Sequence, residues 1–357
     1  MTTYQNNRNV HVVGLGLIGA SVALALGDAG WVVTGSDLDT TTETKALVRN
    51  VIASTTFDDA LDLVVIATPA GEVVTVANDL LRRIPNRELI VTDVAGVKNS
   101  IVRNINDPRF LGGHPMAGTE QRGIDGARAE LFQSCTWILT PTTETSPVTY
   151  STLHGILREI GANVVAVSAQ DHDRLVAVAS HVPHLLAGAL MNEASRIAEE
   201  DAVLLQLAAG GFRDMTRVAA GDPSIWPDVL FENRTAITQS LEALEIRLKS
   251  LRDALGQNDR AAIRESLQTA ASARRQLPGR ALSSQNLAYL RVKVSDQPGV
   301  LASVTVAASD LAVNIYDIEI AHGIEGSGGA LLLAIDAQQT ERFSSALTNL
   351  GFQVMRE

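Results

Sequence analysis

Three glycines near the N-terminus constrain the fold more than any other feature of the chain. The apolar run at residues 10–13 leads into Gly14-Leu15-Gly16-Leu17-Ile18-Gly19, and helix-forming residues follow. At this spacing the first glycine permits a tight turn, the second lets the backbone approach a pyrophosphate, and the third lets the helix pack closely on the strand. Free N–H groups at the helix start favour a bound phosphate. The pattern predicts a dinucleotide-binding unit, and a glycine-rich turn without a ligand is the alternative.

Further apolar runs at residues 31–35, 63–67, 89–91, 137–139 and 163–167 alternate with helical stretches. This alternation predicts a Rossmann-type parallel sheet covered by helices on both faces, which we place at residues 8–170. Asp37 lies 18 positions after Gly19, at the end of the second run, where a carboxylate binds the adenosine ribose and repels a 2′-phosphate. No arginine occurs in residues 38–42, so NAD is favoured over NADP. Thr68 and Pro69 end the third run and are expected to line the nicotinamide side.

Composition limits the class of protein. A chain of 357 residues with 46% hydrophobic and 19% charged residues is typical of a globular protein with two or three domains. The net charge of −11 argues against nucleic acid as a partner. The single cysteine, Cys135, cannot form an intrachain disulfide, which favours the cytoplasm. The polar N-terminus resembles no signal peptide, and no uninterrupted apolar run approaches the roughly 20 residues that span a bilayer, so we expect no membrane.

The character of the chain changes after residue 170. Residues 171–277 lack strand-like runs and predict an all-helical domain, with one long helix at 175–200 kinked at Pro183 and a helical break near Gly256. Such a domain offers a surface for a homodimer, and packing only on its own sheet is the alternative. Residues 277–286 suggest a linker. Residues 287–357 show the element order β-α-β-β-α-β, which predicts a ferredoxin-like domain.

His114 is the first candidate for chemistry. It lies between Gly112-Gly113 and Pro115, which predicts a fixed loop, and histidine is well suited to proton transfer near neutral pH. A structural loop histidine is the alternative. Asp214 and Arg217 follow Gly210-Gly211, and an arginine held by a carboxylate is suited to clamp a substrate carboxylate. An internal surface ion pair is the alternative there. With the glycine pattern, these residues indicate a hydride-transfer enzyme.

Two more histidines lie three residues apart. His181 and His184 share one face of the long predicted helix, and Asp171, His172 and Asp173 precede them. These residues lack the spacing of a recognisable metal site, so no metal is predicted. We expect one of the two histidines to face a cleft and the other to pack.

Five segments, in order, resemble the prephenate/arogenate dehydrogenase family of tyrosine biosynthesis. They are VVGLGLIGAS, VTDVAGVK, GGHPMAGTE, SHVPHLLAGAL and GGFRDMTRVAAGDPSIW, which span residues 12 to about 226. The tail resembles an ACT regulatory domain through DQPGVL, which contains Asp296 and Gly299, and through Asn314. The resemblance implies a NAD-dependent oxidation and decarboxylation of prephenate or arogenate, with tyrosine as an effector that binds near these three residues.

The resemblance also implies roles for individual residues. His114 would accept the proton of the substrate ring hydroxyl, and Arg217, steadied by Asp214, would bind a substrate carboxylate. His184 would line the substrate pocket, and Glu120 would gate the cleft or tie its loop to the GGF segment. One departure stands out, because Gly96 occupies the place where many members of the family carry a serine.

Two other hypotheses remain at this point. A β-hydroxyacid-type or imine-reducing enzyme would rely on a lysine or aspartate in the helical part, but Lys249 is the only lysine there and lies in a charge-rich helix. A non-catalytic module that senses a nucleotide and an amino acid would have a damaged catalytic set, and Gly96 is the one hint of this.

Overall fold

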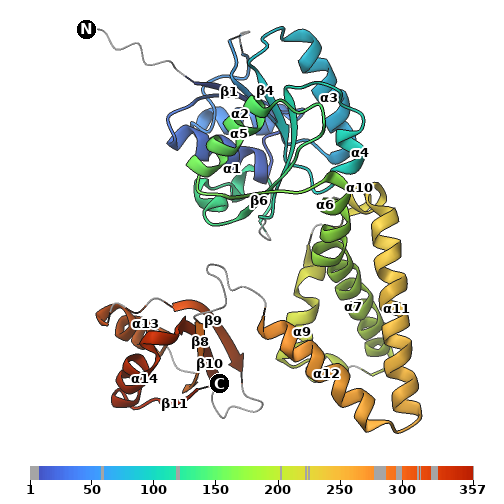
Figure 1. The fold of residues 1–357 in the computed structure, drawn as a ribbon, viewed down its shortest axis with the longest axis vertical. Helices are drawn as coiled ribbons and strands as arrows, with labels where there is room; N and C mark the ends of the chain where they lie inside the picture. The colour runs from blue at the N-terminus through green and yellow to red at the C-terminus, as the bar shows by residue number, and fades with distance from the viewer. Residues whose placement is uncertain are drawn as a thin grey trace. The chain divides into compact units, whose positions relative to one another are not determined.

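The computed structural model describes residues 8–57, 60–117, 121–201, 203–221, 223, 226–276, 287–294, 300–311, 313, 315–322 and 329–356 (Figure 1). They form two compact units, Met1–Ala189 with Val218–Leu244, and Leu190–Arg217 with Glu245–Glu357. The predicted linker at 277–286 and the candidate residues Glu120, Asp296, Gly299 and Asn314 lie outside the described residues.

A seven-stranded sheet organises the first unit, in the order β2-β1-β3-β4-β5-β6-β7. Its strands are β1 (Asn9–Val13), β2 (Val32–Ser36), β3 (Leu63–Ile66), β4 (Ile90–Asp93), β5 (Phe110–Pro115), β6 (Thr136–Thr140) and β7 (Asn163–Ala166). The chain leaves β1 for β2 on one side and then crosses to β3 on the other. The carboxyl ends of β1 and β3 therefore form a topological switch point, where open sheets bind ligands.

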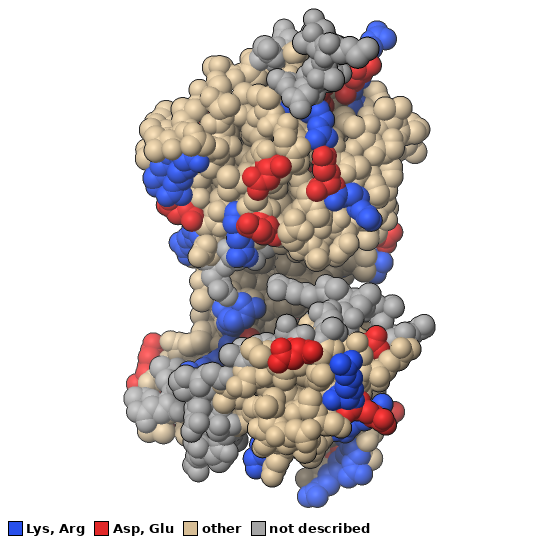
Figure 2. All heavy atoms as spheres, turned by 90° about the vertical axis from the view of Figure 1, so that its left-hand side faces the viewer, with Lys and Arg blue, Asp and Glu red and all other residues tan. Residues whose placement is uncertain are grey.

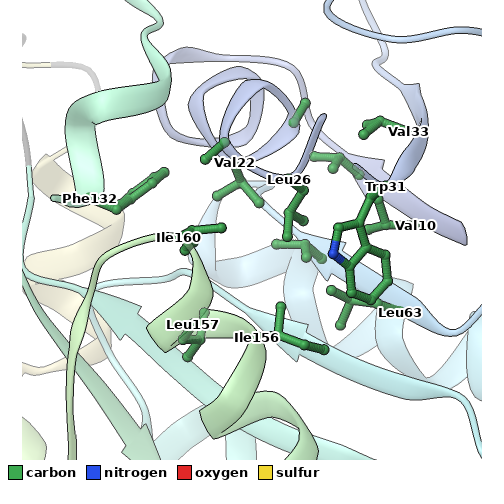
Figure 3. Close-up of a cluster of buried hydrophobic side chains, with 14 of the residues drawn as sticks. Val10, Val22, Leu26, Trp31, Val33, Leu63, Phe132, Ile156, Leu157 and Ile160 are labelled. Carbon is green, nitrogen blue, oxygen red and sulfur yellow. The ribbon is translucent and has the colours of Figure 1, made fainter. Parts of the chain in front are cut away.

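Helices cover both faces of this sheet, as predicted. Figure 1 shows α1 (Leu17–Asp28) and α5 (Pro147–Glu159) on one side, and α3 (Ala70–Arg83) and α4 (Asn99–Val102) on the other. Alternate residues of a strand point to opposite faces. Accordingly, Leu63 packs beneath α1 and α5 with the residues of Figure 3, whereas Val64 packs beneath α3. α2 (Thr40–Val48) follows β2. Asp39 is its N-cap, and the carboxylate of Asp39 accepts from Thr41 N and Thr42 N.

Two strands, β6 and β7, depart from the predicted parallel arrangement. β6 runs antiparallel to β5, with Gly112 opposite Thr140 and His114 opposite Ile138, whereas the other neighbouring strands are parallel. A parallel neighbour requires a crossover connection that returns the chain to the other end of the sheet. The described residues between β5 and β6 form only the short 3₁₀ turns η1 (Ile124–Gly126) and η2 (Ala129–Phe132), so β6 starts from the end where β5 stops.

A continuous helix runs from Ala169 to Glu200. It consists of α6 (Ala169–Val176), a π-helical turn η3 (Ala177–His181) and α7 (Val182–Glu200). Pro183 lacks an N–H for the regular helical ladder, and the ladder widens in the turn before it. By length and composition this helix could cross a membrane, a test that the core helix of a soluble protein or a signal sequence also passes. Its apolar window is only 28% buried in the chain itself.

The remaining helices are α8 (Val203–Gln206), α9 (Gly210–Thr216), the 3₁₀ turn η4 (Arg217–Ala220), α10 (Trp226–Glu232), α11 (Arg234–Gly256) and α12 (Arg260–Arg275). The predicted break near Gly256 is confirmed as the junction of α11 and α12. Asp259 caps α12 by accepting from Ala262 N.

The tail has the predicted element order. β8 (Leu287–Val294), α13 (Val300–Asp310), β9 (Ile315–His322), β10 (Gly329–Asp336), α14 (Thr340–Asn349) and β11 (Gln353–Arg356) follow one another. The strands form a small antiparallel sheet in the order β11-β8-β10-β9. Its apolar core includes Leu290, Val292, Leu333, Phe343 and Leu347.

Acidic and basic side chains intermingle on the face shown in Figure 2. Ion pairs in the first unit include Arg8 with Glu159, and Lys45 and Arg49 with Asp125. These pairs are largely exposed and contribute little to stability.

Candidate active site

The glycine turn after β1 fits a dinucleotide. Gly14 has φ +92°, and a Cβ there would lie 2.6 Å from Ala67 O, while a Cβ at Gly19 would overlap Gly14 O. The chain itself therefore requires these two glycines. Gly16 has φ −68°, and a Cβ there would meet nothing within 4 Å. Among the described residues, nothing explains the missing side chain of Gly16, whereas close approach of a pyrophosphate does.

The start of α1 offers donors to an anion. Gly16 is the N-cap, provides no side-chain cap, and is followed by a first turn without acidic residues. The N–H groups of the first turn, which begins with Leu17 and Ile18, therefore remain for a phosphate. Thr68, at the end of β3, has a buried Oγ1 without a hydrogen-bond partner among the described residues, as a group awaiting a ligand would. Pro69 follows as the N-cap of α3.

Asp37 follows β2 and braces this turn. Its Oδ2 accepts from Leu15 N at 2.7 Å, and its Oδ1 accepts from Asp39 N at 2.9 Å. Because a carboxylate oxygen has two acceptor positions, both oxygens can still receive a ribose hydroxyl. The carboxylate thus joins the glycine turn to the position predicted for the adenosine ribose.

His114 lies on β5 and begins a chain of buried polar groups. Its Nδ1 lies 2.8 Å from Nε2 of His172, and Nδ1 of His172 lies 2.8 Å from Oδ1 of Asp173. His172 is fully buried and Asp173 nearly so. The strand–loop–helix topology therefore aligns the imidazole of His114 with the adjacent residues His172 and Asp173, although His114 and His172 are 58 residues apart in the sequence.

Backbone donors fix the carboxylate at the end of this chain. Oδ1 of Asp173 accepts from Lys98 N at 2.8 Å, and Oδ2 accepts from Asn99 N at 3.0 Å. Asn233, at the start of α11, donates to Asp173 O at 2.8 Å and lies 3.1 Å from Nδ1 of His181. Four elements, β5, α4, α6 and α11, thus meet at Asp173.

A fully buried ion pair lies beside His114. Lys98 donates its Nζ to Oδ2 of Asp93, and neither side chain is exposed. Asp93 also accepts from Ala95 N at 3.0 Å and from Gly113 N at 3.2 Å, directly before His114. A buried charge is stable only when paired and hydrogen-bonded, so this pair fixes the turn after β4 against β5.

The environment keeps His114 neutral. Burial lowers its pKa well below the ordinary 6.5, and positive charge on His172, Lys98 or His181 would lower it further. Burial also lowers the pKa of His181 to about 4 and lowers that of His184. An imidazole that stays unprotonated near neutral pH can accept a proton.

Gly96 lies beside the His114 ring. A Cβ at Gly96 would lie 3.8 Å from His114 Nε2, 3.9 Å from its Cε1 and 3.9 Å from a methyl group of Val229. These are ordinary van der Waals distances, so the chain does not require a glycine there. Gly113 is different, since its Cβ would lie 2.8 Å from Asp93 O. The missing side chain of Gly96 leaves the Nε2 edge of His114 open.

The two histidines of the long helix differ as expected. His181 is buried and faces Asn233, whereas His184 is partly exposed and stacks on Trp226, with ring centroids 3.6 Å apart and planes inclined by 16°. The described residues contain no group of three or more His, Cys, Asp or Glu that could hold a metal ion. His184 and Trp226 present an aromatic surface suited to a planar ring.

Asp214 and Arg217 belong to the second unit, where they lie on α9 and at the start of η4. Both side chains are exposed. Their predicted roles, and that of Glu120, remain predictions.

Several residues of the polar network escaped the sequence analysis. In the sequence, His172 and Asp173 stand out only as possible metal ligands, and no local pattern indicates a role for Lys98, Asp93 or Asn233. A charged residue at the end of a buried apolar strand, such as Asp93, was the available signal. His172 lies 58 residues from His114, and Asp173 lies 75 residues from Lys98 and 60 from Asn233, so only the fold brings these groups together. Lys98 and Asp93, by contrast, are five residues apart.

Comparisons with known proteins agree with this geometry. The nucleotide-binding domain of prephenate dehydrogenase, as a family, matches residues 22–166, and the dimerization domain of prephenate dehydrogenase matches residues 168–269. The prephenate dehydrogenase of Bacillus subtilis strain 168 is 30% identical over 356 residues, which cover 95% of each chain. The cyclohexadienyl dehydrogenase of Zymomonas mobilis is 33% identical over 264 residues, 71% of this chain and 90% of that one.

Solved structures give the same result. Prephenate dehydrogenase from Aquifex aeolicus, in complex with hydroxyphenyl propionate and NAD⁺, has a TM-score of 0.71 and 28% identity, covering 77% of this chain and 100% of that one. Arogenate dehydrogenase from Synechocystis has a TM-score of 0.66 and 31% identity, covering 76% and 100%. The predicted resemblance is confirmed over both matched domains, and the chain belongs to the prephenate dehydrogenase family.

Proposed function

We propose that the chain is a NAD-dependent dehydrogenase that converts prephenate to 4-hydroxyphenylpyruvate and CO₂ in tyrosine biosynthesis. The observation that carries this proposal is the position of His114, whose Nδ1 is bonded to His172 and whose Nε2 edge lies beside Gly96. Family membership and the glycine turn after β1 support the same activity.

The chemistry requires few groups from the protein. Bound NAD supplies the acceptor for a hydride from the ring carbon that carries the hydroxyl. The carboxylate on the opposite ring carbon leaves as CO₂, and its electron pair makes the ring aromatic. His114 Nε2 accepts the hydroxyl proton and returns it to the phenolic oxygen, so the overall reaction releases no proton. A base that accepts a proton and returns it to the same oxygen suits a reaction of this kind.

Other residues would hold the substrate. Arg217 would bind a carboxylate with Asp214 as its support, because a guanidinium binds a carboxylate through paired hydrogen bonds. His184, stacked on Trp226, would lie near the substrate side chain, and Glu120 would act at the edge of the cleft.

The test is the initial rate of cofactor reduction with prephenate and arogenate, each paired with NAD and NADP. We expect rapid NAD reduction with prephenate, and a loss of about a thousandfold in His114→Ala, within the usual range for a general base. His154→Ala, in α5, is the control and should keep the wild-type rate. Absence of turnover with either substrate would refute the proposal and favour a sensing module or a β-hydroxyacid-type enzyme.

Arogenate is the second candidate substrate, because the Synechocystis arogenate dehydrogenase resembles this chain as closely as the prephenate enzymes do. The two substrates differ only by a keto group or an ammonium in the side chain. A higher kcat/KM with arogenate in the same assay would assign the chain to that reaction.

We also propose that the helical region forms a homodimer in the cytoplasm. The helix Ala169–Glu200 carries exposed apolar side chains that fall on one face, at Leu175, Val178, Leu186, Leu190 and Ile197. Such a stripe needs cover, and the matched dimerization domain supports a second copy rather than a lipid bilayer. Cys135, half-buried with a pKa raised to about 11, is consistent with a reducing compartment.

For the tail we propose an ACT-like regulatory domain that binds tyrosine near Asp296, Gly299 and Asn314. The antiparallel sheet and the element order support this assignment. Adding tyrosine to the rate assay tests it: inhibition is expected, and an unchanged rate at millimolar tyrosine would refute it.

A further inference from the structure

We propose that His172 and Asp173 are positioning residues that hold His114 with its Nε2 lone pair toward the substrate and stabilise the charge it acquires on accepting a proton. This inference rests on the proposed role of His114 as proton acceptor, and it adds two residues to the machinery of the reaction.

The hydrogen bonds decide which nitrogen of each ring carries a proton. Asp173 accepts backbone N–H groups at both oxygens, from Lys98 and from Asn99, so its carboxylate acts as an acceptor. The group at 2.8 Å from Oδ1, Nδ1 of His172, must therefore be the donor. With its N–H on Nδ1, His172 has a lone pair on Nε2, and that lone pair accepts Nδ1–H of His114 at 2.8 Å. The lone pair of neutral His114 then lies on Nε2.

The free lone pair lies on the ring atom that faces Gly96. Nε2 is the ring atom nearest to the Cβ position of Gly96, at 3.8 Å, and no protein side chain grows from that position. The opposite ring edge is closed by His172, which is fully buried. In the other tautomer, Nε2 would carry a proton and could not accept one, so the orientation set by Asp173 determines whether His114 acts as a base.

The hydrogen-bonded groups His172 and Asp173 also offset surroundings that disfavour a positive charge on His114. His114 is partly buried and lies near Lys98, whose positive charge opposes its protonation, while Asp93 pairs with Lys98. When a proton arrives at Nε2, the Nδ1–H of His114 can move toward Nε2 of His172. His172 keeps its Nδ1–H and continues to donate it to Asp173, so the new positive charge on His172 lies next to a carboxylate. No proton leaves the chain, and the transfer reverses when the product oxygen takes its proton back.

The first experiment compares two variants at the middle position. In His172→Gln, the amide oxygen can still accept Nδ1–H of His114, whereas His172→Leu removes every polar contact. We expect kcat to fall about a hundredfold or more in His172→Leu, an effect typical of misorienting a reactive group. His172→Gln should retain clearly more activity, and the KM for NAD should stay unchanged in both.

The matched control is His11→Gln in β1. His11 is likewise buried and bonded at both ring nitrogens, to Thr34 Oγ1 at 2.8 Å and to Ser36 Oγ at 3.0 Å. Loss of this histidine should lower the melting temperature and leave kcat and its pH profile unchanged. Equal kcat in wild type and His172→Leu, or equal losses in His172→Leu and His11→Gln, would overturn the proposal.

A second measurement does not depend on activity. The ¹⁵N chemical shifts of histidine-labelled protein without substrate report which ring nitrogen carries the proton, and His114→Ala assigns the signal. We expect a protonated Nδ1 and an unprotonated Nε2 at His114 in the wild type and in His172→Gln, and a mixture in His172→Leu. A wild-type His114 protonated on Nε2 would overturn this inference even if prephenate is turned over.

Discussion

Single residues show which glycines serve the chain and which serve a ligand. Gly14 and Gly19 are enforced by backbone atoms that a side chain would strike, whereas a Cβ at Gly16 would meet nothing within 4 Å and a Cβ at Gly96 would make only ordinary van der Waals contacts with His114 and Val229. The described part of the chain would therefore admit a side chain at Gly16 and at Gly96. The two positions lie where the pyrophosphate and the reacting ring are proposed to bind.

Filling the space at Gly96 should therefore affect catalysis more than folding. Gly96→Val would place methyl groups against the Nε2 edge of His114, and we expect kcat/KM for prephenate to fall at least tenfold, since small displacements of reacting groups are costly. Steady-state rates and a melting curve measure both effects. Gly155→Ala in α5, where a Cβ would meet nothing within 4 Å, is the control and should keep full activity. A Gly96→Val enzyme with wild-type kcat/KM would show that substrate lies elsewhere.

Asp37 has two roles that a single variant separates. Asp37→Asn keeps an oxygen for Leu15 N but removes the charge that repels a 2′-phosphate. We expect the ratio of kcat/KM for NADP to that for NAD to rise about tenfold or more, because like charges in contact cost several kcal/mol. Asp39→Asn, at the cap of α2, should leave this ratio unchanged. An unaltered ratio in Asp37→Asn would contradict the assignment of Asp37 to the ribose.

At the scale of elements, one side chain joins the long helix to α11. Asn233 is 3% exposed and donates to Asp173 O in α6 while facing His181. Asn233→Leu would leave the carbonyl of Asp173 and Nδ1 of His181 without this partner. We expect a loss of about 1–3 kcal/mol in the free energy of unfolding, the cost of unsatisfied buried groups, measured by urea denaturation. Asn192→Leu, exposed on α7, should change it by less than about 0.5 kcal/mol.

The elements themselves were largely predictable. Apolar runs, glycine turns and the break near Gly256 mark strands and helices because burial periodicity and turn chemistry are local. Two features were not. The antiparallel direction of β6 depends on a connection without a crossover helix, and a proline within a helix predicts a kink without specifying the π-helical turn that precedes Pro183.

For the whole molecule, the apolar stripe of the long helix predicts how copies associate. Leu190 is 36% exposed in its middle, and Leu190→Arg would place a charge in the proposed homodimer interface. We expect a dimer in the wild type and a shift toward monomer in the variant by light scattering coupled to size exclusion. Val148→Arg, at an exposed position of α5, should remain dimeric. A monomeric wild type would refute the dimer.

Buried histidines predict how the stability of the molecule depends on pH. Burial lowers the pKa of His11 and of His181 to about 4, and that of His114 well below 6.5. Between pH 6.5 and 4 these histidines bind protons in the unfolded chain but not in the folded protein. The free energy of unfolding therefore decreases as the pH falls, by up to about 1.4 kcal/mol per pH unit for each histidine. Urea denaturation at pH 7 and pH 5 measures this, and His11→Gln should reduce the slope. A stability that is unchanged between these pH values would contradict the buried, neutral state of the three rings.

The sequence by itself determined the Rossmann-type domain, the helical region and the order of elements in the tail, and it predicted His114 as the group for proton transfer. Those features depend on local patterns: glycine spacing, apolar periodicity and residue chemistry within a short segment. Only the tertiary structure decided that His172 and Asp173 stand behind His114, that Lys98 pairs with Asp93 beside it, and that Gly96 leaves its outer edge open. The contacts of His172 and Asp173 join β5 and the start of α4 to α6 across 58 to 75 residues, and hydrogen-bond partners at such separations follow from the path of the chain rather than from any local pattern.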